Sequence, residues 1–246
     1  MKKNLGTYSL TLDESPVSKR IIKSGLYEAK ETALIKKVMK PRDIFIDVGA
    51  YIGYYTVMVS KIIGSGGKVF SFEPARDNFK LLTRNIIDNN CKNVCSYNMA
   101  LGKPNGEMEQ DFYLNPNNSG DHKLYRDSAI EEKTTVAVLP FDDILKVPEL
   151  CDWIKLIKID TQGAEIGVLS GMGKTIQRHK KLIIMVEFYP YGLIKMNEHP
   201  DTLIKMLWNL GFTIYDIRNN LKRINDIHFY SNYIGQKFTN LWCVKK

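Results

Sequence analysis

The stretch that most constrains the fold runs from Asp43 to Ser60. It contains the short apolar run IFIDV, then the loop GAYIG, and ends with apolar residues at helical spacing in YYTVMVS. A short apolar run bounded by glycines is typical of a buried parallel strand, and the longer segment after it is typical of a helix. Strand, glycine loop and helix in this order predict an open α/β sheet with a ligand at the carboxyl end of the strand.

The spacing of the loop narrows the class of ligand. A dinucleotide site needs G-x-G-x-x-G, because the second glycine lets a pyrophosphate approach the helix N-terminus. Here Tyr51 stands two residues after Gly49 and would crowd a pyrophosphate, while Asp47 places a carboxylate beside the pocket. A carboxylate suits a cationic ligand better than a phosphate. The loop therefore predicts a nucleoside with a positive centre.

A second strand predicts how that nucleoside is held. The run KVFSF, residues 68–72, ends in Glu73, twenty residues after Gly53. An acidic side chain at this distance, at the end of the neighbouring strand, can accept two hydrogen bonds from a ribose diol. We therefore expect Glu73 to bind the ribose.

Three motifs in order now carry a resemblance to a known family. They are DVGAYIGYYT from Asp47, FEPARDNF from Phe72 and KIDTQGAE from Lys158. Together they resemble class I S-adenosylmethionine-dependent methyltransferases and, more narrowly, the FkbM family of O-methyltransferases, over about residues 41–216. The resemblance implies S-adenosyl-L-methionine as cofactor. It also implies one doubly wound α/β sheet of seven mostly parallel strands, with helices on both faces and the last strand antiparallel.

The resemblance and the strand ends together predict the donor site. Asp47 and Glu73 would hold the amino-acid and ribose portions of the donor. Ala100 and Leu101 follow the third strand, whose end lies beside the adenine ring in the resembled fold. The predicted cofactor-binding residues are Asp47, Gly49, Ala50, Tyr51, Gly53, Glu73, Asn78, Ala100, Leu101 and Asp160.

Three side chains are predicted to act on the acceptor, because transfer to a hydroxyl requires alignment and removal of a proton. Asp160 follows strand four, residues 153–159, which should lie next to strand one at the topological switch point. Glu187 follows strand five, residues 182–186, on the same edge. His122 lies in a long polar loop and could act as a general base; anchoring that loop is the competing interpretation.

The resemblance points to a hydroxyl acceptor on a saccharide, glycoconjugate or natural product. An RNA ribose 2′-O-methyltransferase is the alternative enzyme, favoured slightly by the net charge of +8 but not by the scattered distribution of lysine and arginine. A non-catalytic protein that only binds S-adenosylmethionine is a third interpretation.

Length and composition predict a single domain. We expect residues 1–40 to form an N-terminal helical cap on a methyltransferase domain of residues 41–246, with an inserted loop or hairpin at about 107–139. The four cysteines form no C-x-x-C pair, so we predict no metal site. Without a targeting segment or an apolar run of bilayer length, we expect a cytoplasmic protein with no membrane span.

Overall fold

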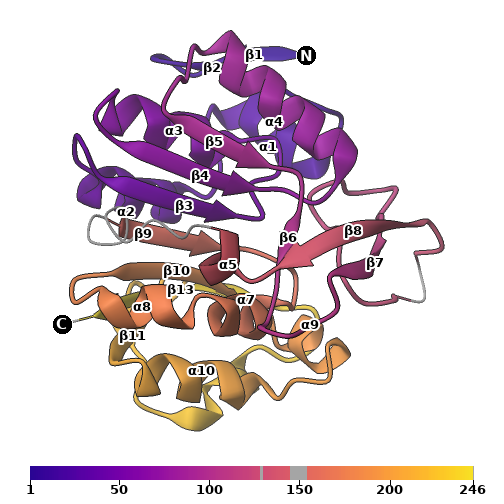
Figure 1. Cartoon of the computed structure of the whole chain (residues 1–246), viewed down its shortest axis with the longest axis vertical. Helices are drawn as coiled ribbons and strands as arrows, with labels where there is room; N and C mark the ends of the chain where they lie inside the picture. The colour runs from indigo at the N-terminus through magenta and orange to yellow at the C-terminus, as the bar shows by residue number, and fades with distance from the viewer. Residues whose placement is uncertain (128–129, 145–153, 246) are drawn as a thin grey trace.

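The structure is a computed structural model that describes residues 1–127, 130–144 and 154–245 (Figure 1). Trp153, predicted as the first residue of strand four, lies outside the described residues. Among the described residues, no helix is long and apolar enough to cross a membrane.

A large, mostly parallel sheet forms the centre of the molecule. Its strands are β3 (Ile44–Val48), β4 (Lys68–Phe72), β5 (Val94–Tyr97), β9 (Ile154–Ile159), β10 (Ile183–Phe188), β11 (Phe212–Asp216), β12 (Lys222–Arg223) and β13 (Thr239–Lys245). Their order is β12-β11-β13-β10-β9-β3-β4-β5. β13 runs antiparallel to both β10 and β11, so the last strand is antiparallel as predicted.

The predicted strand count of seven is wrong by one short strand. Among the described residues the sheet has eight strands, because the chain turns back after β11 and β12 pairs antiparallel with it. The backbone N–H of Leu221 donates to the carbonyl of Asp216 at 2.8 Å and closes this turn. A two-residue strand carries no recognisable alternation, which is why the sequence pattern did not predict it.

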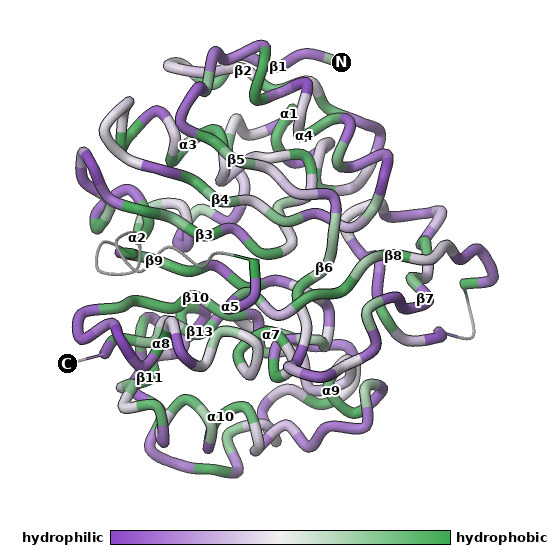
Figure 2. The backbone as a smooth tube through the Cα atoms, viewed as in Figure 1, coloured by the Kyte–Doolittle hydropathy of each residue, from purple (hydrophilic) through white to green (hydrophobic). Residues whose placement is uncertain are grey.

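Alternation along each strand divides the apolar side chains between two layers. On β3, Ile44, Ile46 and Val48 join one hydrophobic cluster and Phe45 joins the other. Successive side chains of a strand point to opposite faces, so each face needs its own cover. Figure 2 shows hydrophobic residues concentrated along β9 and β10, between the layers.

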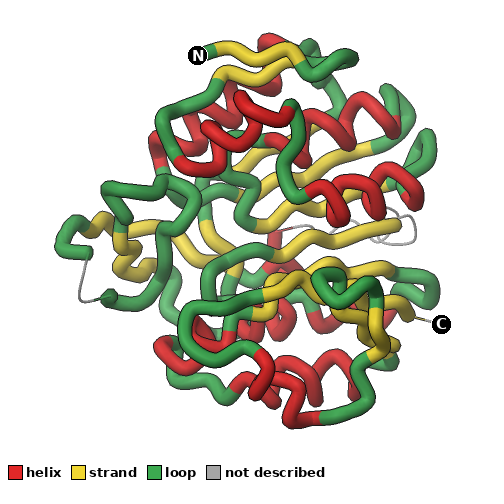
Figure 3. Tube along the Cα trace, turned by 180° about the vertical axis from the view of Figure 1, so that it is seen from behind, coloured by secondary structure: helices red, strands yellow, loops and turns green. Residues whose placement is uncertain are grey.

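Helices cover both faces of the sheet (Figures 1 and 3). The cluster that contains Phe45 also includes residues of α3 (Tyr54–Ile63), α1 (Pro16–Ser24) and α2 (Ala29–Val38). The opposite cluster includes residues of α7 (Glu165–Gly171), α8 (Gly173–Arg178) and α10 (Pro200–Asn209). Within the described ranges, the other helical segments are α4 (Arg76–Asp88), α5 (Phe141–Ile144), α9 (Pro190–Lys195) and the short 3-10 helix η1 (Ile227–Asn232).

The first forty residues contain more than helices. A hairpin of β1 (Lys2–Asn4) and β2 (Ser9–Thr11) precedes α1 and α2. The side-chain amide of Asn85, on α4, accepts from the Thr11 N–H at 2.6 Å and donates to the carbonyl of Ile52 at 2.8 Å. One buried side chain thus connects the N-terminal hairpin to the glycine loop.

The inserted segment forms a small sheet beyond the carboxyl ends of the parallel strands (Figures 1 and 3). β7 (Glu109–Tyr113) and β8 (Lys133–Leu139) pair antiparallel, and β8 also pairs with β6 (Ala100–Leu101). β7 and β8 lie within the segment 107–139 that was predicted as an insertion. Its connecting loop lies over the edge of the central sheet where the site is found.

Candidate active site

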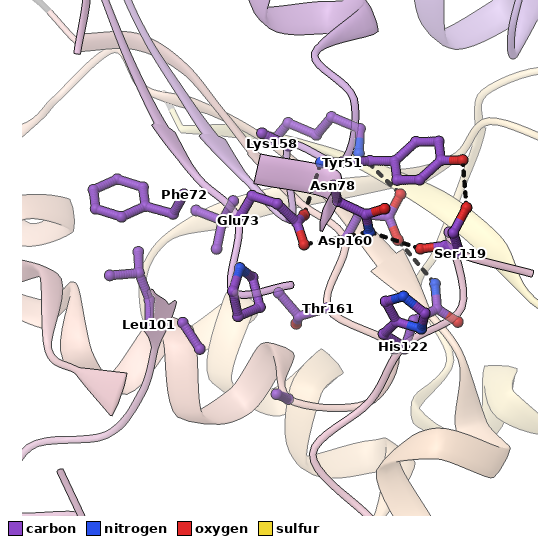
Figure 4. A pocket seen from close by; sticks show the side chains of 18 of the residues that line it. Tyr51, Phe72, Glu73, Asn78, Leu101, Ser119, His122, Lys158, Asp160 and Thr161 are labelled. Atoms are coloured by element: carbon purple, nitrogen blue, oxygen red, sulfur yellow. Dashed lines mark hydrogen bonds and ion pairs between the residues drawn. The ribbon is translucent and has the colours of Figure 1, made fainter. Parts of the chain in front are cut away.

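A cavity of about 890 Å³ opens at the carboxyl ends of β3, β4 and β9 (Figure 4). Of the residues predicted to bind the cofactor, it is lined by Gly49, Ala50, Tyr51, Glu73, Asn78, Ala100, Leu101 and Asp160. His122 also lines it.

The two glycine positions of the loop have no space for a side chain. Gly49 has φ +77°, and a Cβ built there would lie 1.9 Å from the carbonyl oxygen of Asp160. Gly53 has φ +88°, and its Cβ would lie 2.6 Å from Cδ1 of Leu82. Only glycine adopts such backbone conformations at no steric cost. The loop can therefore lie directly against the end of β9.

Glu73 lies in the cavity wall with both carboxylate oxygens oriented by backbone groups. Its Oε2 accepts from the Tyr51 N–H at 2.8 Å, and its Oε1 accepts from the Ala75 N–H at 2.9 Å. Burial raises the pKa of this carboxyl to about 7, against the hydrogen bonds that lower it. Oε1 also accepts a longer hydrogen bond from the Asn78 amide, at 3.5 Å, whereas Oε2 keeps one lone pair that can accept from a ribose hydroxyl.

The wall beyond Glu73 is apolar. Phe72, Met99, Ala100, Leu101 and Phe112 line this part of the cavity. Asn78, on α4, donates its amide to the carbonyl of Ser119 at 2.8 Å and so fixes the insertion loop beside Glu73. An apolar surface next to the carboxylate of Glu73, the predicted ribose ligand, suits the adenine and ribose of a nucleoside.

Tyr51 connects three parts of the chain at the cavity (Figure 4). Its hydroxyl donates to Asp13 at 2.7 Å and lies 2.7 Å from the Ser15 hydroxyl and 2.8 Å from the Ser119 hydroxyl. Ser119 also donates to Asp13. The Tyr51 side chain, which was predicted to crowd a pyrophosphate, therefore joins the glycine loop to the N-terminal segment and to the insertion through its hydroxyl.

Asp47 lies behind the loop. It is 1% exposed, is absent from the described residues that line the cavity, and accepts from the Thr56 hydroxyl at 2.6 Å. Burial raises the pKa of its carboxyl. Its other oxygen has no protein partner among the described residues. Direct contact of Asp47 with the amino-acid portion of the donor stays a prediction.

Asp160 lies at the cavity floor within a buried polar cluster. Its Oδ2 pairs with the Lys158 ammonium at 2.9 Å, and its Oδ1 accepts from the Gln162 amide at 3.0 Å. The same amide nitrogen lies 3.0 Å from Oε2 of Glu187 and can donate to it. Asp160 is thus positioned by both neighbours and open to the cavity.

Glu187 lies deeper than predicted, inside β10 and only 4% exposed. It is absent from the described residues that line the cavity. Burial, with the charges of Asp160 and Glu165, raises the pKa of its carboxyl well above the ordinary value. The Gln162 amide thus links Glu187 to Asp160, and direct action of Glu187 on the acceptor stays a prediction.

His122 is held by its own loop. Its Nδ1 accepts from the Asn115 N–H at 2.9 Å, and burial lowers the pKa of the ring. The Nδ1 lone pair is therefore occupied, and the neutral ring carries its proton on Nε2. This geometry favours the loop-anchoring interpretation, and a role for His122 as general base stays a prediction.

Several residues of the site were not predicted from the sequence. Lys158 is 3% exposed and lies over the ring of Tyr55 at 5.1 Å. Its pKa is raised because Asp160, Asp47 and Glu28 together outweigh the effect of burial. Tyr27, from the N-terminal segment, also lines the cavity. A lysine inside an apolar strand could have indicated that Lys158 belongs to the site. The sequence around Tyr27 contains no comparable indication.

Comparison with known proteins agrees with this site. Residues 47–214, more than half of the chain, match the model of the methyltransferase FkbM domain. Methyltransferase 1 of Beauveria bassiana is 28% identical over 152 residues, which are 54% of this chain and 59% of that protein. The hexuronic acid methyltransferase AglP of Haloferax volcanii is 28% identical over 145 residues, 58% of this chain and 56% of that protein. The chain thus spans less than two thirds of either curated relative.

A solved structure shares the fold. A Streptococcus mutans methyltransferase in complex with SAH superposes with a TM-score of 0.52 at 15% identity, over 90% of this chain and 99% of that chain.

The mostly parallel sheet, its reversed last strand and the glycine-loop cavity define a class I methyltransferase. The chain belongs to the FkbM family of S-adenosylmethionine-dependent methyltransferases. The predicted family and its S-adenosyl-L-methionine cofactor are confirmed. The cavity suits that cofactor, since it combines a ribose acceptor, an apolar wall and the carboxylate of Asp160. Among the described residues, no three His, Cys, Asp or Glu side chains are grouped to hold a metal.

Proposed function

We propose that this chain transfers the methyl group of S-adenosyl-L-methionine to a hydroxyl group of a saccharide or glycoconjugate. The observation that carries the proposal is the position of Asp160, held by Lys158 and Gln162 at the cavity floor beside the glycine loop. A relative that acts on a hexuronic acid supports a sugar acceptor.

When bound, the cofactor supplies a methyl group already activated on a sulfonium. The protein then has to position the acceptor hydroxyl and take its proton. Asp160 carries a spare lone pair on each carboxylate oxygen after its bonds to Lys158 and Gln162, so it can accept that proton. Lys158 keeps its own proton, because the surrounding carboxylates raise its pKa. Its charge therefore holds Asp160 in place and does not compete for the proton.

The cavity also limits the entry of water around Asp160. Tyr27 and Tyr55 line it, and the Tyr55 hydroxyl donates to Glu28 at 2.7 Å. Both rings stand edge-on or tilted against neighbouring tyrosines, with the Tyr54–Tyr55 centroids 5.1 Å apart. Excluding water strengthens the electrostatic contacts of Asp160.

The variant Asp160→Asn tests this proposal. It keeps the size of the side chain and removes the base, so turnover should fall by about 10²- to 10⁴-fold. Calorimetry measures donor affinity separately, so that a loss of turnover at saturating donor is assigned to the missing base. The exposed Asp143→Asn is the matched control.

The acceptor class is tested by transfer of a labelled methyl group to saccharide extracts and to RNA in parallel. Label on a saccharide that disappears with Asp160→Asn would support the proposal. Label only on RNA, or full turnover by Asp160→Asn, would overturn it.

A further inference from the structure

A second cavity of about 980 Å³ lies where the chain leaves β11 and passes through β12 to η1. Three cationic side chains line it, Arg218, Lys222 and Arg223. So do the amides of Asn219, Asn225 and Asn232 and the rings of Phe229 and Tyr233. None of these residues has a place in the donor site.

The three cations and the two acidic residues of the lining, Asp216 and Asp226, leave this cavity with a formal net charge of +1. Within the described ranges, none of the three cations forms an ion pair. The two acidic residues of the lining are occupied by their own loops. Asp216 accepts from the Tyr233 and Thr239 hydroxyls, each at 2.7 Å, and Asp226 accepts from the His228 N–H at 2.9 Å. The cations therefore remain available to an anion.

The cavity lies on the same edge of the sheet as Asp160. β11 and β10 both run antiparallel to β13, so they are parallel to each other and their carboxyl ends share one edge. Three strand spacings separate the end of β9 from the end of β11, roughly 14 Å at the usual distance between strands. An acceptor longer than one sugar ring is needed to contact both places.

An aromatic pair follows the end of β10. Tyr189, two residues after Glu187, packs edge-on against Phe238 with centroids 6.4 Å apart. The Arg218 guanidinium, which lines the second cavity, lies over the Phe238 ring at 5.3 Å from its centroid. Phe238 is 37% exposed, so part of its ring is open to solvent. Aromatic faces of this kind pack against the apolar face of a sugar ring.

We propose that the cavity at Arg218, Lys222 and Arg223 is an anion subsite for an acidic saccharide acceptor, with the anionic group a carboxylate or a phosphate. This inference rests on the proposed function and adds the charge and minimum length of the substrate. Arginine binds both groups through paired N–H donors, and the three asparagines can bond sugar hydroxyls. An RNA backbone, by contrast, requires cations along an extended track. Here the unpaired cations form one compact group.

The test measures binding by calorimetry on the full chain. The probes are a galacturonic acid trisaccharide, the neutral maltotriose, a hexose phosphate and a single-stranded RNA oligonucleotide. Lys222→Gln with Arg223→Gln should weaken binding of the acidic trisaccharide at least tenfold. The same change at Lys180 and Lys181, an exposed lysine pair just before β10, is the matched control and should have no effect. Arg218→Gln is a second variant that leaves β12 unchanged.

Three results would support the subsite: weak or no binding of maltotriose, loss of acidic trisaccharide binding in both variants, and unchanged affinity for S-adenosylmethionine. Tighter binding of the hexose phosphate would identify the anionic group as phosphate. Equal binding of maltotriose, unchanged binding in both variants, or tighter binding of RNA would overturn the inference. These measurements need no turnover, so a lack of methyl transfer would count against the proposed function alone.

Discussion

Gly49→Ala tests how closely the donor loop must approach β9. A Cβ at residue 49 would lie 1.9 Å from the Asp160 carbonyl oxygen, whereas real Cβ contacts are essentially never under 3.0 Å. The loop and the strand end must therefore separate by more than 1 Å. The Asp160 N–H also donates to the Val48 carbonyl at 3.0 Å, so this separation strains the bond between the two strands.

The expected cost has two parts. A left-handed backbone costs a non-glycine residue about 1–2 kcal/mol, and a weakened buried hydrogen bond costs about 1 kcal/mol. We therefore expect a loss of about 2–3 kcal/mol in the free energy of unfolding, measured by urea denaturation. A displacement of about 1 Å at Asp160 should also reduce turnover by about 10²-fold.

Gly25→Ala separates these two parts. Gly25 has φ +70° and ψ +7°, but a Cβ there would have only Leu5 as neighbour, at 4.0 Å. This control should show the backbone cost alone, with donor affinity and turnover unchanged. If Gly49→Ala destabilises the protein no more than Gly25→Ala and keeps full donor affinity, the argument from close approach is wrong.

Two further predictions concern the donor pocket. Because the pKa of Glu73 is raised to about 7, donor affinity should fall below that pH, by up to about tenfold per pH unit, as the ribose acceptor becomes protonated. Calorimetry across this range checks it, and Glu73→Gln should bind weakly without that pH dependence; a pH-independent wild type would contradict the assignment. Tyr51→Phe removes a hydroxyl that contacts Asp13, Ser15 and Ser119. It should lower the free energy of unfolding by about 1–3 kcal/mol and speed donor release in stopped-flow experiments; unchanged values would show that this contact does not hold the cavity closed.

Elements with strong local patterns were predictable from the sequence. The strand predicted at residues 68–72 coincides with β4, because a short apolar run is typical of a buried parallel strand. The position of Glu73 in the donor cavity also follows from strand order alone.

Features that depend on long-range contacts were not predictable. The hairpin of β1 and β2 has three-residue strands, and its position depends on Asn85 and Asn89, more than seventy residues away in the chain. The contacts around Asp160 also depend on packing that the sequence does not reveal. Sequence spacing brings Glu187 to the correct edge, but only packing determines that Gln162 lies between it and Asp160.

The two cavities are built from different parts of the chain, and this has a consequence for how members of the family can come to differ in their acceptors. The donor residues lie within the segment 47–214 that matches the family model. Tyr27, which faces the donor cavity, and Arg218 and Phe238, which lie toward the second cavity, come from outside that segment. Changes at either end of such a chain can alter which acceptor is received and leave the methyl donor site intact. One shared catalytic module can in this way serve many substrates.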